Sequence, residues 1–174
     1  ILSGYVKAID PLGTQYKITD YLEALSLNGV FPDWTILSAS VLLSAVEFTL
    51  GILLLFAIQR RVMSRAMLAV MIFMTIVTVW IYFYNPVQDC GCFGDAIKLT
   101  NGQTLAKNIV LTLCAATVAA RPLNMPRLIS RPNQWIIINY TVIFIFVTSL
   151  LSLYILPMFD FRPYHVGADI KKGM

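Results

Sequence analysis

The stretch ILSASVLLSAVEFTLGILLLFAI, residues 36–58, decides the fold of this chain because it is long and apolar enough to cross a bilayer. A helix needs about 20 predominantly apolar residues to span the hydrocarbon core. Small polar residues and Glu47 are the only interruptions of this run. An α-helix satisfies its own backbone hydrogen bonds in lipid, so the stretch predicts a transmembrane helix.

Further apolar runs follow at residues 63–84, 104–120 and 135–156. The run at 104–120 is the least apolar, because Lys107 and Asn108 lie in its first turn and Lys107 must extend toward water. Together the four runs predict an all-α protein, a polytopic membrane helical bundle with four full transmembrane helices.

The composition supports an integral membrane protein over a soluble one. Apolar residues make up 58% of the chain and charged residues 13%, and the mean hydropathy is +0.74, all far from soluble averages. We expect a transmembrane domain at 1–158 and a periplasmic tail at 159–174 that links to a further domain. The apolar opening, residues 1–4, is predicted to be the end of a truncated first span.

A mixed polar and apolar pattern between Gly13 and Trp34 predicts a short helix lying on the membrane surface, or an ordinary surface helix. The string Asp10-Pro11-Leu12-Gly13 before it predicts a turn, with Thr14 as the helix cap. Lys7 and Asp10, one helical turn apart, predict an ordinary surface pair.

Charge is distributed unevenly over the predicted connectors. The connectors 59–65 and 121–134 contain no acid, and every acid except Glu47 lies in the opposite set of connectors. The positive-inside rule therefore places the two connectors in the cytoplasm. These arginines also explain the net charge of +4, so nucleic acid is not expected as a partner. The arginines concerned are Arg60, Arg61, Arg65, Arg121, Arg127 and Arg131.

Two cysteines, Cys90 and Cys92, flank Gly91 in the loop between the second and third runs. This loop faces outward, to the oxidising side, where a disulfide can persist. A bridge across one residue is tight, and Gly91 is the residue type that tolerates the backbone angles it requires. Strain makes a disulfide a stronger oxidant. The pair therefore favours redox exchange, with a fixed structural bridge or two inert thiols as alternatives.

Two other residues bear on the chemistry. Cys114 lies ten residues past Thr104, roughly 15 Å along its helix, too far to complete a closed metal site with the loop cysteines, so no metal is expected. Glu47 falls near mid-bilayer, where an ionised carboxylate must be protonated, paired or exposed to a polar cavity. It is either a structural clasp between helices or a proton acceptor.

The string Cys90-Gly91-Cys92-Phe93-Gly94 resembles the MauE branch of the DoxX-like membrane proteins, together with the following Lys107-Asn108 and with Glu47 and Gly51 in the preceding span. The resemblance covers about residues 1–120. It implies a small helical bundle that assists periplasmic disulfide formation or electron delivery. The last span, residues 135–156, and the tail after it resemble larger Bacteroidota forms of the family, in which a periplasmic thioredoxin-like domain follows.

The leading hypothesis is an inner-membrane thiol-disulfide redox protein in which Cys90 and Cys92 exchange with a periplasmic thioredoxin-like protein or domain. Lys98 favours the reactive thiolate, opposed by Asp89 and Asp95. A quinone is a candidate membrane carrier, lodged near three aromatic residues: Trp80, Tyr82 and Tyr84. The alternative is a non-catalytic scaffold subunit of a larger envelope complex, with the Cys-Gly-Cys loop as a docking feature.

Overall fold

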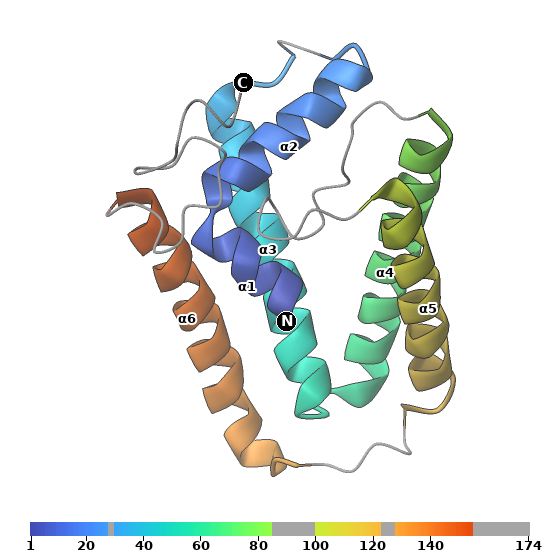
Figure 1. The fold of residues 1–174 in the computed structure, drawn as a ribbon. Helices are drawn as coiled ribbons and strands as arrows, with labels where there is room; N and C mark the ends of the chain where they lie inside the picture. Colours follow the sequence, from blue (N-terminus) through green and yellow to red (C-terminus); the bar gives the residue numbers. More distant parts are fainter. Residues whose placement is uncertain (28–29, 85–99, 123–127, 155–174) are drawn as a thin grey trace.

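The computed structural model describes residues 1–27, 30–84, 100–122 and 128–154, and this part of the chain is helical with short connections (Figure 1). The helices are α1 (Leu2–Ile9), α2 (Pro11–Ala24), α3 (Asp33–Leu55), α4 (Arg60–Tyr84), α5 (Asn101–Ala120) and α6 (Gln134–Tyr154), with the 3-10 turn η2 (Arg131–Asn133) directly before α6. Within the described residues, α3 to α6 are long and apolar enough to cross a membrane. The predicted all-α fold with four spans is confirmed.

The turn between α3 and α4 corrects one predicted boundary. The chain leaves α3 at Leu55 and re-enters a helix at Arg60, so the predicted connector 59–65 is wrong and its three arginines belong to α4. Ala57 and Gln59 take positive φ angles of 53° and 43° to make the turn. Ala57 and Ile58 are buried in it. Because turn residues are themselves apolar, hydropathy could not mark the end of the helix.

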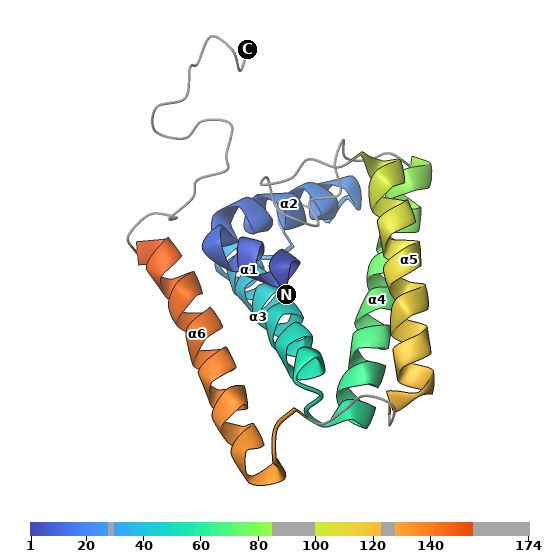
Figure 2. The ribbon, with the colours of Figure 1, turned by 60° about the horizontal axis from the view of Figure 1, so that its bottom comes forward.

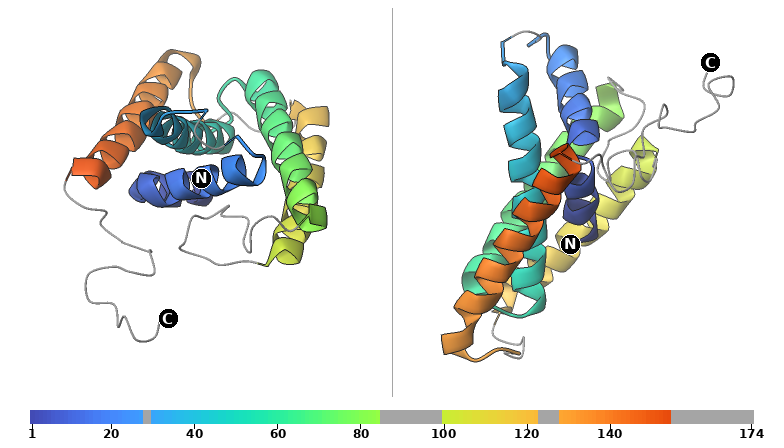
Figure 3. Two further views of the ribbon diagram at one scale, coloured as in Figure 1. Left: turned by 90° about the horizontal axis from the view of Figure 1, so that it is seen from above. Right: turned by 90° about the vertical axis from the view of Figure 1, so that its left-hand side faces the viewer.

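The helices form three groups, which Figure 2 shows from the side and the left view of Figure 3 shows from above. The α4–α5 hairpin lies on one side, α6 lies on the other, and α3 lies between them with α1 and α2 against it. In keeping with this arrangement, α1 packs on α3 and α6, while α2 packs mainly on α3. α3 is therefore the central helix that holds the two sides together.

Close packing between α1 and its neighbours involves Gly4 and an aromatic cluster. A Cβ on Gly4 would lie 2.6 Å from the backbone nitrogen of Phe48, so α1 and α3 approach there at backbone distance. Beside this crossing, Tyr5 stacks on Phe144 with ring centroids 6.3 Å apart, and Phe48 stacks on Phe144 at 5.7 Å. The cluster joins α1, α3 and α6 at one point.

The junction between α1 and α2 differs from the predicted turn. α2 begins at Pro11, and the Asp10 carboxylate caps it by accepting from the Gly13 backbone N–H at 2.9 Å. Proline suits the first helical position and aspartate is a favoured N-cap. The predictions of a turn through Gly13 and of Thr14 as the cap are therefore wrong, since the helix starts earlier.

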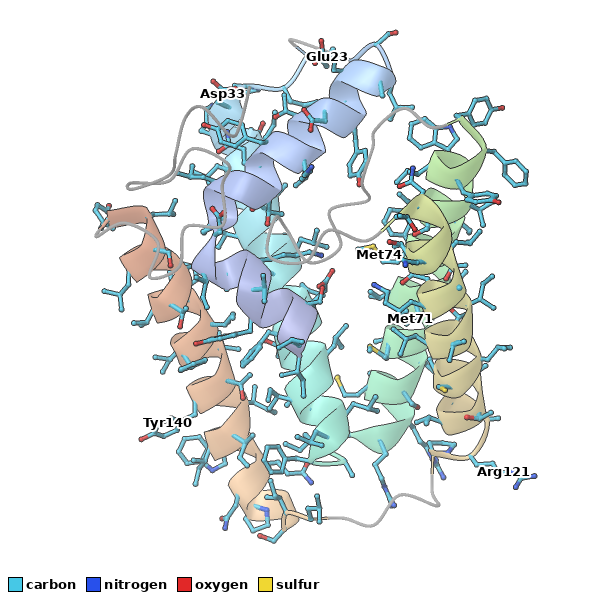
Figure 4. All side chains as sticks on the ribbon, in the orientation of Figure 1. Glu23, Asp33, Met71, Met74, Arg121 and Tyr140 are labelled. Carbon is cyan, nitrogen blue, oxygen red and sulfur yellow. The ribbon has the colours of Figure 1, made fainter. Side chains whose placement is uncertain are left out.

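Charged residues mark the two ends of the bundle (Figure 4). Glu23 and Asp33 lie at the end where α2 meets α3, and Arg121 lies at the opposite end, with the start of α4. α4 ends and α5 begins at the acid-bearing end. Tyr84 and Thr100, which flank residues 85–99, are therefore both at that end.

Candidate functional site

An ion pair that is largely buried joins α1 to the middle of α3. Lys7 Nζ lies 2.7 Å from Glu47 Oε1, and the two side chains are 5% and 13% exposed. Ser3 Oγ donates a hydrogen bond of 2.8 Å to the other oxygen, Glu47 Oε2. Ser3 and Lys7 are four positions apart and so share one face of α1. One short helix thus supplies partners to both carboxylate oxygens.

This geometry overturns the predicted surface pair of Lys7 and Asp10. Both residues are buried, and Lys7 pairs with Glu47 on another helix. Two residues three positions apart share one face only if the helix continues through both of them. Because Pro11 starts a new helix, Asp10 turns its carboxylate to the cap of α2 instead.

Of the states considered for Glu47, the structure shows pairing. Removing two charges from water is costly, and attraction between them offsets this cost only when the geometry is good and the remaining lone pairs are satisfied. The short Lys7 contact and the Ser3 hydrogen bond meet both conditions. Glu47 therefore acts at least as a clasp between α1 and α3.

The ion pair lines a cavity of about 300 Å³ between α1, α3, α4 and α5. The size is at the lower end of the range for small-molecule pockets. Its apolar walls come mainly from α4, and Figure 4 shows Met71 and Met74 extending from that helix toward α3. Apolar lining residues include Leu50, Met67, Val70, Met71, Met74 and Leu111.

α5 adds polar groups to the same cavity. Lys107 and Asn108 line it from the side opposite Lys7 and Glu47. Lys107 is half-buried rather than fully extended into water. Two lysines from separate helices thus converge on one mostly apolar space. The sequence pattern marked Lys107 and Asn108 as unusual in a span, but it could not show that they face Glu47.

Hydrogen bonds across α4 and α5 hold the hairpin together. Asn108 Nδ2 donates to Thr78 Oγ1 at 2.7 Å, and the hydroxyls of Thr75 and Thr112 are 2.7 Å apart. In lipid such bonds tie helices because unpaired polar groups are costly. At the start of α5, Thr100 and Gln103 form a reciprocal capping box. α4 and α5 are therefore joined by hydrogen bonds as well as by apolar packing.

Cys90, Cys92 and their neighbours lie outside the described residues, which stop at Tyr84 and resume at Thr100. The same holds for the predicted supporting residues Gly91, Phe93, Gly94 and Lys98. The third cysteine, Cys114, is free and exposed on α5, so it faces away from the bundle.

The aromatic residues proposed for a carrier pack against one another and against Phe83 near the end of α4. Trp80 and Tyr84 pack together with centroids 6.2 Å apart, while Tyr82 packs edge-on against Phe83. Tyr84 is 74% exposed. The three predicted residues Trp80, Tyr82 and Tyr84 are not among those that line the cavity. They sit at the end of α4, next to the cysteine loop.

Fold and site together define a multi-pass membrane protein with an ion pair and a small cavity inside its helical bundle. The profile of the family described as methylamine utilisation protein MauE matches residues 1–121. The chain therefore belongs to the MauE family, in agreement with the resemblance over residues 1–120, and the match covers α1 to α5. Searches of curated proteins and of solved structures found no match.

Proposed function

We propose that this protein is a thiol-disulfide redox protein of the bacterial inner membrane, with Cys90 and Cys92 cycling between dithiol and disulfide. The observation that carries the proposal is the position of the loop's flanking residues. Tyr84 and Thr100 lie at the acid-bearing end of the bundle, opposite Arg121 and the arginines of α4. An arginine-rich end is expected in the cytoplasm, which puts the loop in the periplasm, where disulfides persist.

The exchange partner is a dithiol protein or domain of the thioredoxin-like class. Its thiolate attacks one sulfur of the Cys90–Cys92 disulfide, which forms a mixed disulfide and releases the other sulfur as a thiolate. The partner's second thiolate then cleaves the mixed disulfide. The partner leaves oxidised by two electrons, and Cys90 and Cys92 become a dithiol that has taken up the two protons the partner lost.

The rigid α4–α5 hairpin supports this role because it fixes both ends of the reactive loop. The bonds from Asn108 to Thr78 and between Thr75 and Thr112 provide that rigidity. Membership of the MauE family is consistent with an envelope role.

The test is a mixed-disulfide trap in the full-length protein. Cys92→Ser leaves Cys90 able to form a mixed disulfide with the oxidised partner that Cys92 can no longer resolve. When free thiols are alkylated at lysis, so that the partner's second thiol cannot cleave the bond, we expect an adduct with one periplasmic partner on non-reducing gels. The double variant Cys90→Ser with Cys92→Ser should abolish the adduct and the oxidation of the partner dithiol, while the protein still assembles in the membrane. Cys114→Ser is the matched control and should behave as wild type, because that thiol faces away from the bundle.

A scaffold role predicts the opposite result. In that case the double variant at Cys90 and Cys92 keeps both its complex and its function, and no adduct forms in any single variant. Thiol labelling followed by mass measurement, before and after mild reduction, is a second test. The proposal would be contradicted if Cys90 and Cys92 were never found in a disulfide and never exchanged with another thiol.

A further inference from the structure

We propose that the cavity between α1, α3, α4 and α5, rather than the aromatic residues at the end of α4, binds the head group of a membrane-soluble quinone. The inference rests on the proposed redox function, because a dithiol that is to be reoxidised needs an acceptor of two electrons. It adds a site, and residues for that site, to that function.

The lining of the cavity matches a flat, apolar ring that carries acceptor oxygens. The walls are mostly apolar, and the polar lining residues are Ser3, Lys7 and Glu47 on one side and Lys107 and Asn108 on the other. Ser3 and Lys7 donate to the two carboxylate oxygens of Glu47, and Asn108 Nδ2 donates to Thr78. The groups that offer further N–H donors to a ligand are therefore the two ammonium groups. An ammonium group has three donors, and Lys7 uses one for Glu47. Lys7 can therefore donate to a carbonyl oxygen of the ring without losing Glu47.

The methionines of α4 suit an aromatic ligand. Met67, Met71 and Met74 follow each other at helical spacing on the face of α4 that lines the cavity. Thioether sulfurs make favourable contacts with ring edges, and the flexible side chain adapts to ligands that come and go. A branched aliphatic wall would offer the same apolar area with less adaptability.

The cavity also lies within reach of the reactive loop. Lys107 is seven residues beyond Thr100, which is about 10 Å along α5. Eight residues connect Cys92 to Thr100, a length of chain that can span about 26 Å. The covalent length therefore allows the cysteine pair to meet a ring held at the Lys107 side of the cavity.

A quinone can accept the two electrons and two protons that the dithiol releases. Two S–H bonds of Cys90 and Cys92 break and one S–S bond forms, which releases two electrons and two protons. Both carbonyl groups of the quinone are reduced to hydroxyls, which takes up the same two electrons and two protons. The regenerated disulfide is then ready for the next partner dithiol.

Photoaffinity labelling tests the proposal by binding rather than by activity. The full-length protein with Cys90→Ser and Cys92→Ser, in phosphatidylcholine nanodiscs, is irradiated with a short-tailed azido-quinone, and the labelled peptides are mapped by mass spectrometry. We expect label on the cavity-lining parts of α4 and α5. Met71→Trp, which fills the cavity, should reduce labelling to background.

Ile72→Trp is the matched control, since it adds the same bulk one residue away on the exposed face of α4 and should leave labelling unchanged. Lys107→Met keeps the side-chain volume and removes a donor, so the quinone affinity should fall about tenfold, the effect of losing one charged hydrogen bond. This variant decides the matter if Met71→Trp does not fold.

Three results would overturn the site: label confined to the Trp80 and Tyr84 region, equal loss in Met71→Trp and Ile72→Trp, or displacement of the quinone by palmitate or phosphatidylglycerol at matching concentration. The last would make the cavity a lipid site. Because the cysteines are absent from the assay, quinone binding without any mixed disulfide in the trap would refute the redox function alone. A mixed disulfide without quinone binding would refute the cavity alone.

Discussion

Glu47 joins α3 to α1 through both of its carboxylate oxygens. Its carboxylate lies in the middle of α3 and accepts from Lys7 and from Ser3, both on α1. Each residue alone would be unfavourable inside a bilayer, and together they satisfy one another. The short helix α1 is therefore attached to the bundle by charge as well as by apolar contact.

Glu47→Gln should destabilise the protein strongly, because it leaves the Lys7 ammonium buried without its counter-charge. Breaking one side of a buried pair costs about 3–5 kcal/mol. Thermal unfolding of the purified full-length protein in detergent measures this. Glu23→Gln is the matched control: Glu23 is exposed on α2, and its substitution should change the free energy of unfolding by about 0.5 kcal/mol or less.

The double variant Lys7→Met with Glu47→Leu tests the reason for the loss. Replacing a buried pair with apolar residues of similar volume is often neutral, so most of the lost stability should return. If Glu47→Gln and Glu23→Gln had the same free energy of unfolding, the ion pair would not contribute to the stability of the fold.

At the residue scale, the sequence indicated that the Glu47 carboxylate is costly inside a span, but it did not indicate that Lys7 is its partner. A carboxylate inside an apolar run must be protonated, paired or exposed to a polar cavity, and that much follows from residues 36–58 alone. The partner is 40 positions away, and no spacing rule links two different helices. The sequence also predicted that Asp10 pairs with Lys7. In the structure a new helix starts at Pro11, and the Asp10 carboxylate caps that helix instead.

At the scale of elements, α1 and α3 cross at Gly4 with their backbones in close contact. A Cβ on Gly4 would meet two backbone atoms, Phe48 N at 2.6 Å and Ser44 O at 2.8 Å. Small residues at such crossings let helix backbones approach in lipid. The approach also brings Lys7 within reach of Glu47.

Gly4→Ala should therefore separate α1 from α3 and weaken the ion pair. Overpacking of this kind costs about 1–3 kcal/mol, and we expect that loss in the free energy of unfolding. Gly102→Ala in α5 is the matched control, because its Cβ would meet only the Tyr82 ring at 3.7 Å. There alanine should be neutral or stabilising by up to about 1 kcal/mol through helix propensity. Equal effects at both glycines would show that the crossing tolerates expansion.

The four spans were predictable because hydropathy depends on each segment's own residues. Their contacts were not, because lipid-facing and buried positions in a bilayer are both apolar and leave no clear periodic pattern. The hydrogen bond from Asn108 to Thr78 illustrates this limit. Both residues stand out in their spans, yet only the fold shows that they meet.

The molecule as a whole separates its charges between its two ends. Arginines gather where α3 meets α4 and where α5 ends, and acids gather around α2 and the start of α3. The separation was visible in the sequence, and the structure adds that the flanks of the cysteine loop share the acidic end. Orientation in the membrane therefore decides whether the proposed chemistry meets an oxidising compartment.

Single cysteines introduced into a cysteine-free background test that orientation. Glu23→Cys and Arg121→Cys report on opposite ends of the bundle, and both positions are exposed. With an impermeant maleimide applied to spheroplasts, Glu23→Cys should react at once, and Arg121→Cys only after the membrane is permeabilised, because arginines are retained on the cytoplasmic side. The reverse pattern would place the Cys90–Cys92 pair in the reducing cytoplasm, where a persistent disulfide is not expected and metal binding or a docking role would fit the pair better.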